Sequence, residues 1–304
     1  MRILDLKLTY RCDNDCGMCC QDRNLRNINS DLKLQDVKEI YKNEENTHTI
    51  DKVVLTGGEP TLSPEIIRIV EFFKKQGIKN IQLQTNAKRL KDPKFLARLT
   101  EAGINSFGIS LHGHCQEVHE RFTCTRGSFK EVILALENLK NSKASIALNA
   151  VITQANINNL GELVCFVQKN NYAHSLQFAY IHITGKAESN RNEVVRIAEA
   201  AEKVKKVIHN FAGGTIKIYT EAIPYCLMRN YEKHVAELYN DSEIITYDKF
   251  QKRDFTKARK NEFKAKARHC EHCLFDSICE GPWYEYPREF GFDEFIPVTD
   301  FRSV

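Results

Sequence analysis

The chain has 304 residues, of which 42% are hydrophobic and 28% are charged, and its formal net charge is +4 at pH 7. This length can bury a substantial core and fits one large domain with a small appendage. The charge balance gives no argument for nucleic-acid binding, although the excess of Lys and Arg is compatible with an acidic or phosphorylated substrate.

Residues 1–8 form a short apolar run without the basic start and long apolar stretch of a signal peptide. No later segment reaches the roughly 18 to 20 apolar residues that span a bilayer. We therefore expect a cytoplasmic protein that does not contact a membrane. Eleven cysteines are many for a compartment that disfavours disulfides, so clustered cysteines are predicted to be metal ligands.

Up to about residue 218, short β-branched runs alternate with longer amphipathic ones. Strands are predicted at 3–8, 52–56, 80–85, 106–111, 145–152 and 175–180. Helices are predicted at 34–42, 64–76, 93–101, 128–141, 158–170 and 191–209. This repeated alternation predicts an α/β fold with a parallel sheet and right-handed crossovers, either a partial barrel or a doubly wound sheet.

The pattern changes after Gly213-Gly214. A short strand at 215–219 leads to a charged stretch at 248–268, which we expect to be a solvated helix or loop, and then to a cysteine group and an aromatic tail. We therefore divide the chain into a core domain, 1–215, and a small second domain, 216–304, with little regular structure.

Three cysteines directly follow the first predicted strand. Cys12, Cys16 and Cys19 have the spacing C-x3-C-x2-C, which allows one loop to bind three irons of a [4Fe-4S] cluster and leave the fourth open. An electron-transfer cluster normally takes four thiolates, whereas a metal site that binds a substrate needs a vacant position. The alternative is a zinc site or buried free thiols, but Cys20, adjacent to Cys19, is badly placed to complete a zinc tetrahedron.

This spacing and its position resemble the radical S-adenosylmethionine (SAM) superfamily. The resemblance implies a partial (β/α)6 TIM-like barrel in which the amino and carboxylate groups of SAM chelate the open iron. It also implies that an electron, from a donor such as flavodoxin or ferredoxin, cleaves SAM to methionine and a 5'-deoxyadenosyl radical that abstracts a substrate hydrogen. Met18 stands where the family usually has an aromatic residue, and its thioether can still pack against adenine.

The second predicted strand ends in a segment that resembles the family's GGEP motif, namely Gly57-Gly58-Glu59-Pro60. Glycines let the backbone approach a ligand closely, and the resemblance implies that the Glu59 carboxylate accepts a hydrogen bond from the SAM ammonium group. Later strands supply further candidates for lining SAM or the substrate: Asn86, Ser110, Asn149 and Phe178. The alternative for the polar ones is that they satisfy neighbouring backbone groups.

Segment 112–129 contains three histidines and two cysteines, and we expect it to be a loop above the active site. Cys115 and Cys124 are therefore candidates for a substrate contact or a thiol hydrogen donor, with an ordinary loop as the alternative. Cys165 lies on the apolar face of a predicted helix, where we expect it to pack in the core.

A second cysteine group, Cys270, Cys273 and Cys279, resembles the auxiliary-cluster motif of SPASM and shorter twitch domains in radical SAM enzymes. Trp283 replaces the next cysteine of the full SPASM pattern, so we predict one auxiliary [4Fe-4S] cluster. With Cys226 as fourth ligand, that cluster would serve electron relay or structural support; without it, one iron would be open to substrate. The alternative is a zinc knuckle. The aromatic tail is expected to pack over the cluster.

Enzymes with this two-part layout commonly modify a peptide, so the resemblance implies a peptide substrate such as a natural-product precursor. Two alternatives stay open. One is an enzyme acting on a small molecule, such as a sugar, nucleotide or cofactor precursor. The other is a non-catalytic zinc or iron-sulfur interaction protein.

Overall fold

The computed structural model describes residues 1–21, 31–46, 48–248 and 251–300. Within these ranges, one sheet has the spatial order β7-β6-β5-β4-β3-β2-β1-β8-β9. Its strands are β1 (Arg2–Thr9), β2 (Lys52–Gly57), β3 (Asn80–Thr85), β4 (Ser106–Ser110), β5 (Ser145–Ile152), β6 (Ser175–Tyr180), β7 (Lys217–Glu221), β8 (Glu243–Asp248) and β9 (Gln251–Asp254). Neighbours from β7 to β8 run parallel, and β9 pairs antiparallel with β8.

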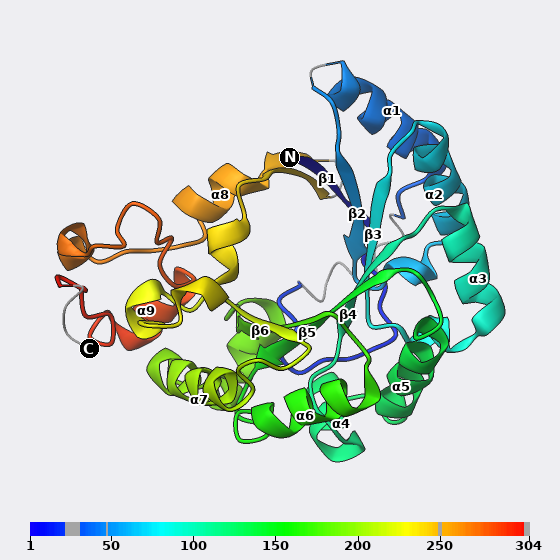
Figure 1. The fold of residues 1–304 in the computed structure, drawn as a ribbon. Helices are drawn as coiled ribbons and strands as arrows, with labels where there is room; N and C mark the ends of the chain where they lie inside the picture. Colours follow the sequence, from blue (N-terminus) through cyan, green and yellow to red (C-terminus); the bar gives the residue numbers. More distant parts are fainter. Residues whose placement is uncertain (22–30, 47, 249–250, 301–304) are drawn as a thin grey trace.

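Figure 1 shows the first seven helices in an arc around the outside of the curved sheet. They are α1 (Leu34–Glu45), α2 (Ile66–Lys75), α3 (Pro93–Ala102), α4 (Gln116–Thr123), α5 (Ser128–Leu139), α6 (Leu160–Asn170) and α7 (Ile197–Asn210). Because these helices cover the outer face of the sheet, the predicted partial barrel is confirmed and the doubly wound alternative is excluded. No helix in the described ranges is long and apolar enough to cross a membrane.

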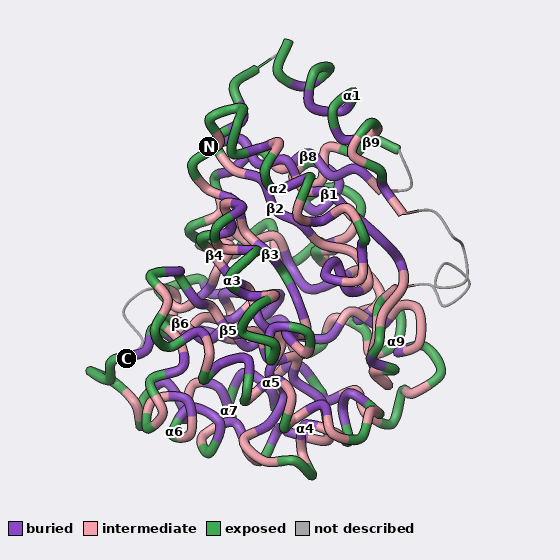
Figure 2. Tube along the Cα trace, turned by 90° about the vertical axis from the view of Figure 1, so that its right-hand side faces the viewer, coloured by how far each residue is buried: buried purple, intermediate pink, exposed green. Residues whose placement is uncertain are grey.

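Alternation along β1 shows how the two faces of the sheet differ. Leu4, Leu6 and Leu8 are at most 1% exposed and belong to the hydrophobic core. Asp5 and Lys7, at the intervening positions, point to the opposite face because side chains alternate along a strand. In Figure 2 the buried residues follow the strands, and exposed residues mark the outer sides of the helices. The interior of the curved sheet therefore carries polar side chains.

The sheet continues past residue 215. β7 extends it beyond β6, and β8 pairs with β1 at the other end, with Ile244 opposite Ile3. The expectation of little regular structure after this point is wrong, because β8, β9, α8 (Phe255–Asn261) and α9 (Glu285–Phe290) follow. The division into 1–215 and 216–304 stays a prediction, and the sheet runs across it.

The C-terminal segment spans the open side of the curved sheet, with α8 beside the N-terminal strand and α9 beside α7 (Figure 1). The Tyr286 hydroxyl accepts a hydrogen bond from the Ile197 amide at 3.1 Å. Trp283 Nε1 donates to the Tyr180 carbonyl at 3.2 Å, at the end of β6. These contacts attach the segment to the edge of the sheet where the parallel strands end.

Segment 112–129 is not the predicted loop. It contains α4 and the start of α5. The buried residues of α4 are His119, Phe122 and Thr123, so two of the three are polar and a pattern of apolar residues does not mark the helix. The Cys115 side chain, just before the helix, makes no capping hydrogen bond. The usual signals for a helix start were therefore missing from the sequence.

Candidate active site

The three N-terminal cysteines lie in the loop after β1, at the carboxyl edge of the parallel strands. This edge is where barrel enzymes build their active sites. The Asn14 amide donates to Cys12 Sγ at 3.5 Å, and the Cys19 amide donates to the Cys16 carbonyl at 3.3 Å. All three thiols are partly exposed. The loop thus presents three thiols, one of which already accepts a backbone hydrogen bond, as a cluster ligand does.

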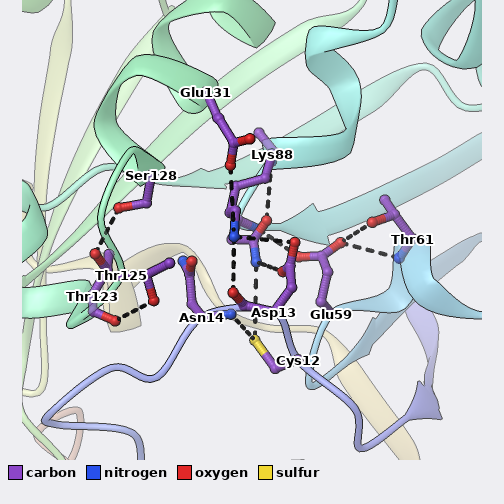
Figure 3. A network of polar contacts seen from close by, with 12 residues as sticks. Cys12, Asp13, Asn14, Glu59, Thr61, Lys88, Thr123, Thr125, Ser128 and Glu131 are labelled. Atoms are coloured by element: carbon purple, nitrogen blue, oxygen red, sulfur yellow. Dashed lines mark hydrogen bonds and ion pairs between the residues drawn. The ribbon is translucent and has the colours of Figure 1, made fainter.

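Two residues that follow β3 hold the start of this loop (Figure 3). Asn86 Nδ2 donates to Asp13 Oδ1 at 2.7 Å and lies 3.9 Å from Cys12 Sγ. Lys88 Nζ donates to the Asp13 carbonyl at 2.8 Å and forms an ion pair with Glu131 at 3.6 Å. Asn86 is therefore at the candidate site as predicted from the strand end, and its contact with SAM stays a prediction.

The two glycines of the GGEP segment lie directly against the start of the cysteine loop. The Gly58 amide donates to the Thr9 carbonyl at 2.7 Å. A Cβ atom on Gly57 would lie 2.2 Å from the Thr9 carbonyl oxygen, and one on Gly58 would lie 2.4 Å from that of Arg11. Glycine is thus required here because two backbone segments meet. The close approach expected toward a ligand is an approach to the loop that carries Cys12.

The Glu59 carboxylate is completely buried and has several protein partners. Oε1 accepts from the Thr61 amide at 3.1 Å, the Thr61 hydroxyl at 2.6 Å and the Thr85 hydroxyl at 2.7 Å, and Oε2 accepts from the Asn86 amide at 2.7 Å. Burial raises the pKa of Glu59, and these hydrogen bonds oppose that rise. Glu59 therefore fastens the turn at Pro60 to the end of β3, and its contact with SAM stays a prediction.

The end of α4 supports the middle of the cysteine loop. The Phe122 carbonyl accepts from the Gly17 amide at 3.0 Å, and a Cβ on Gly17 would lie 3.5 Å from Cys124 Sγ. Cys115 lies just before the other end of α4. Because a helix rises about 1.5 Å per residue, Cys115 is roughly 13 Å from Cys124. The structure therefore brings Cys124, and not Cys115, to the cysteine loop; the catalytic roles of both stay predictions.

The loop after β6 holds the other side of the cysteine loop. The Lys186 amide donates to the Cys19 carbonyl at 2.9 Å, and its Nζ lies 2.9 Å from Asp15 Oδ2. Asn190 Nδ2 donates to the Gly17 carbonyl at 2.6 Å. The sequence carries no signal for Lys186 and Asn190, because they lie beyond a strand end and belong to no recognisable motif.

The remaining predicted cofactor residues differ in placement. Met18 is 6% exposed and lies in the core cluster, so its packing against adenine stays a prediction. Ser110 and Asn149 are partly exposed at or near the ends of β4 and β5. Phe178 is fully buried in the hydrophobic core. The adjacent Gln177 lies on the inner face of β6, where its Nε2 is 3.5 Å from Asn149 Oδ1. The place on the inner face that was predicted for Phe178 is therefore occupied by Gln177.

The four C-terminal cysteines line one pocket. Cys226 contributes to it from the turn after β7, and Cys270, Cys273 and Cys279 contribute from the segment before α9. Burial and, to a smaller extent, the three neighbouring thiols together raise the pKa of the Cys226 thiol to about 12. The structure thus brings Cys226 to the second cysteine group, which is the arrangement that a fully ligated cluster requires. In the described ranges, no group of three His, Cys, Asp or Glu is arranged to hold a single metal ion.

The aromatic tail divides between this pocket and the barrel. Phe292, Phe295 and Pro297 line the pocket, whereas Trp283 points to the end of β6 through its bond to Tyr180. Cys165 is exposed on α6, so the expectation that it packs in the core is wrong.

A family model described as "Radical SAM superfamily" matches residues 6–162, which is just over half of the chain. Curated relatives include a probable GTP 3',8-cyclase of Saccharolobus islandicus, 26% identical over 67% of this chain and 65% of that protein. Another, of Sulfolobus acidocaldarius, is 25% identical over 87% of this chain and 90% of its own length. The first alignment thus spans slightly less than two thirds of the relative's length.

Two solved structures share the fold at low identity. SuiB of Streptococcus suis bound to precursor peptide SuiA superimposes with a TM-score of 0.66 and 19% identity, covering 98% of this chain and 75% of SuiB. The AdoMet-bound native anSMEcpe superimposes with a TM-score of 0.63 and 15% identity, covering 93% and 89%. The family match includes the cysteine loop and the GGEP segment described above. This chain therefore belongs to the radical SAM superfamily.

Proposed function

We propose that Cys12, Cys16 and Cys19 hold the [4Fe-4S] cluster and that SAM binds beside them on the inner face of the barrel. When bound, the cluster and SAM supply a 5'-deoxyadenosyl radical that abstracts a substrate hydrogen. The observation that carries the proposal is the fixed position of the cysteine loop, which Asn86, Lys88 and the loop after β6 hold through hydrogen bonds. These contacts fix the loop that carries the three thiols at the carboxyl edge of the parallel strands.

The test compares the protein with its Cys12→Ala variant after anaerobic cluster reconstitution, with dithionite and SAM added. We expect 5'-deoxyadenosine from the unmodified protein and from a Cys165→Ala control, since Cys165 is exposed on α6. No 5'-deoxyadenosine above the Cys12→Ala background would contradict the proposal.

For the second site, the proposal is one auxiliary [4Fe-4S] cluster with Cys226, Cys270, Cys273 and Cys279 as ligands. The shared pocket supports it. Four thiolates leave no open iron, so this cluster would relay electrons or support the fold instead of binding substrate. A flavodoxin or ferredoxin is the proposed electron donor and the cytoplasm the proposed compartment, because the clusters need a reducing environment.

The substrate that we propose is a peptide. Support comes from SuiB, whose fold covers 98% of this chain and whose structure was solved with a precursor peptide bound. A small-molecule substrate is the second candidate, because a probable GTP 3',8-cyclase aligns over 87% of the chain. Incubating the reconstituted enzyme and SAM with GTP separates the two: 5'-deoxyadenosine formation stimulated by GTP, with a cyclised product, would favour the second candidate.

A further inference from the structure

A group of charged side chains lies between the auxiliary pocket and the interior of the barrel. A short antiparallel bridge between Lys264 and Trp283 separates the two regions. Ala265 and Pro282, the next residues on each side of this bridge, line the auxiliary pocket. Trp283 itself reaches the Tyr180 carbonyl at the end of β6. The bridge therefore forms a wall with the second cysteine site on one side and the ends of β6 and β7 on the other.

Each of three cations in this region already has a carboxylate partner. The N–O distances are 3.0 Å for Lys7 with Asp248, 2.8 Å for Arg259 with Glu280 and 3.2 Å for Lys264 with Glu237. The latter two pairs are almost fully buried, and Lys264 also lies 4.0 Å from the centre of the Trp283 ring. A phosphate group entering this region would therefore have to compete with existing ion pairs.

Two further carboxylates in the same region form no direct ion pair with a Lys or Arg among the described residues. The Glu285 side chain is 10% exposed, and neither of its oxygens accepts a hydrogen bond from the described residues. Oε1 lies 2.9 Å from Nδ1 of His182, which is charged only when protonated. Glu221, at the end of β7, accepts a hydrogen bond from Gln177 Nε2 at 2.7 Å. Burial raises the pKa of Glu221, and the charge of Glu237 adds to that rise, whereas the charges of Lys264, Arg259 and His182 oppose it.

Glu285 is also connected to the radical SAM site. It pairs with His182, and Thr184, two residues further along the chain, donates its hydroxyl to the Cys20 carbonyl at 3.3 Å. His182 precedes the loop that binds the Cys19 carbonyl through Lys186. A nearly buried carboxylate whose basic partner is an imidazole, and not a Lys or Arg, thus lies close to the segment that holds the cysteine loop.

We propose that Glu285 and Glu221 receive a cationic nitrogen of the substrate, an alkylammonium or guanidinium group. This inference rests on the proposed function, because it assigns the substrate class of the same site. A cation would compensate two carboxylates whose burial is otherwise unfavourable. The same charge arrangement disfavours a triphosphate.

The test measures ligand binding to the reconstituted holoenzyme with SAM present, by calorimetry. The probes are acetyl-Gly-Lys-Gly-amide, the same peptide with Nε-acetylated lysine, n-butylamine and GTP. We expect the lysine peptide or the free amine to bind at least about tenfold more tightly than the acetylated peptide, the effect of one charged hydrogen bond. If the lysine peptide binds more tightly than n-butylamine, the cation comes from a peptide side chain. If n-butylamine binds as tightly as the lysine peptide, the cation comes from a small molecule.

Glu285→Gln should abolish this preference, and Glu221→Gln should reduce it. Glu202→Gln is the matched control, because it removes the same charge from a side chain that is 72% exposed on α7. Thermal unfolding and SAM binding check that each variant is folded. Equal binding of both peptides, an unchanged preference in folded Glu285→Gln, or tightest binding of GTP would overturn the inference. Production of 5'-deoxyadenosine by the same preparation reports separately on the proposed function.

Discussion

The indole ring of Trp283 stacks on the imidazole ring of His182, with ring centres 4.2 Å apart and an interplanar angle of 22°. Trp283 directly follows Gly281 and Pro282, which line the auxiliary pocket. His182 comes just before the loop that holds the Cys19 carbonyl. This ring pair therefore joins the segment that lines the auxiliary pocket to the segment that precedes the support of the cysteine loop.

Replacing Trp283 by Phe should destabilise the protein. The variant loses the Nε1 hydrogen bond and leaves the Tyr180 carbonyl without it, a loss of about 1–3 kcal/mol in the free energy of unfolding. Urea unfolding of the anaerobic protein measures the change. Tyr284→Phe is the control, because it alters the neighbouring, partly exposed aromatic residue and keeps its ring beside Arg288. Equal stability of the two variants would contradict the role assigned to the indole nitrogen.

Replacing Gly58 by Ala should displace the cysteine loop, because the new Cβ would lie 2.4 Å from the Arg11 carbonyl oxygen and 2.5 Å from that of Tyr10. We expect loss of iron from the N-terminal site and loss of 5'-deoxyadenosine formation. Gly161→Ala is the matched control, since its Cβ would meet no atom closer than 4.0 Å. A Gly58→Ala protein with full iron content and normal SAM cleavage would show that the close contact is dispensable.

Replacing Cys226 by Ala removes the one proposed auxiliary ligand that lies far from the others in sequence. After anaerobic reconstitution and gel filtration, we expect iron to fall from about eight to about four atoms per chain, the content of one [4Fe-4S] cluster. Iron quantification and electron paramagnetic resonance measure this change. Cys165→Ala should retain the full content, and an unchanged spectrum for Cys226→Ala would exclude Cys226 as a ligand.

Glu44, 2% exposed on α1, should make stability depend on pH. Burial acts to raise the pKa of Glu44, but hydrogen bonds from Lys252 and Tyr247 and the charge of Arg2 lower it below its ordinary value of 4.5. Its contribution is therefore fully present above about pH 4.5 and is lost as the pH falls through the lower folded-state pKa.

The measurement compares the free energy of unfolding of the protein with that of Glu44→Gln from neutral to acidic pH. The difference between them should shrink as the pH falls below 4.5. Glu39→Gln, which changes an exposed carboxylate on the same helix, should show no such loss. A constant difference for Glu44→Gln across the range would contradict the assignment.

Local sequence patterns predicted the parallel strands and the two groups of clustered cysteines well, because both depend on residues close together in the chain. The pairing of β8 with β1 was not predicted, since the sequence of a short strand does not indicate which distant strand it pairs with. Lys186 and Asn190 were missed for the same reason: folding alone brings them to Gly17 and Cys19. The placement of Phe178 was predictable, because strict alternation along β6 assigns Gln177 to the inner face.

The parallel pairing of β8 with β1 also has a consequence for biosynthesis. The cysteine loop and its partners after β2, β3 and β6 all leave the ribosome before β8 is made. Until then one edge of β1 stays unpaired, and the C-terminal segment has not yet bridged the gap in the sheet. Because a domain generally folds as one unit, this edge closes only after β8 has been made, and the proposed N-terminal cluster can be delivered while the nascent barrel is still open.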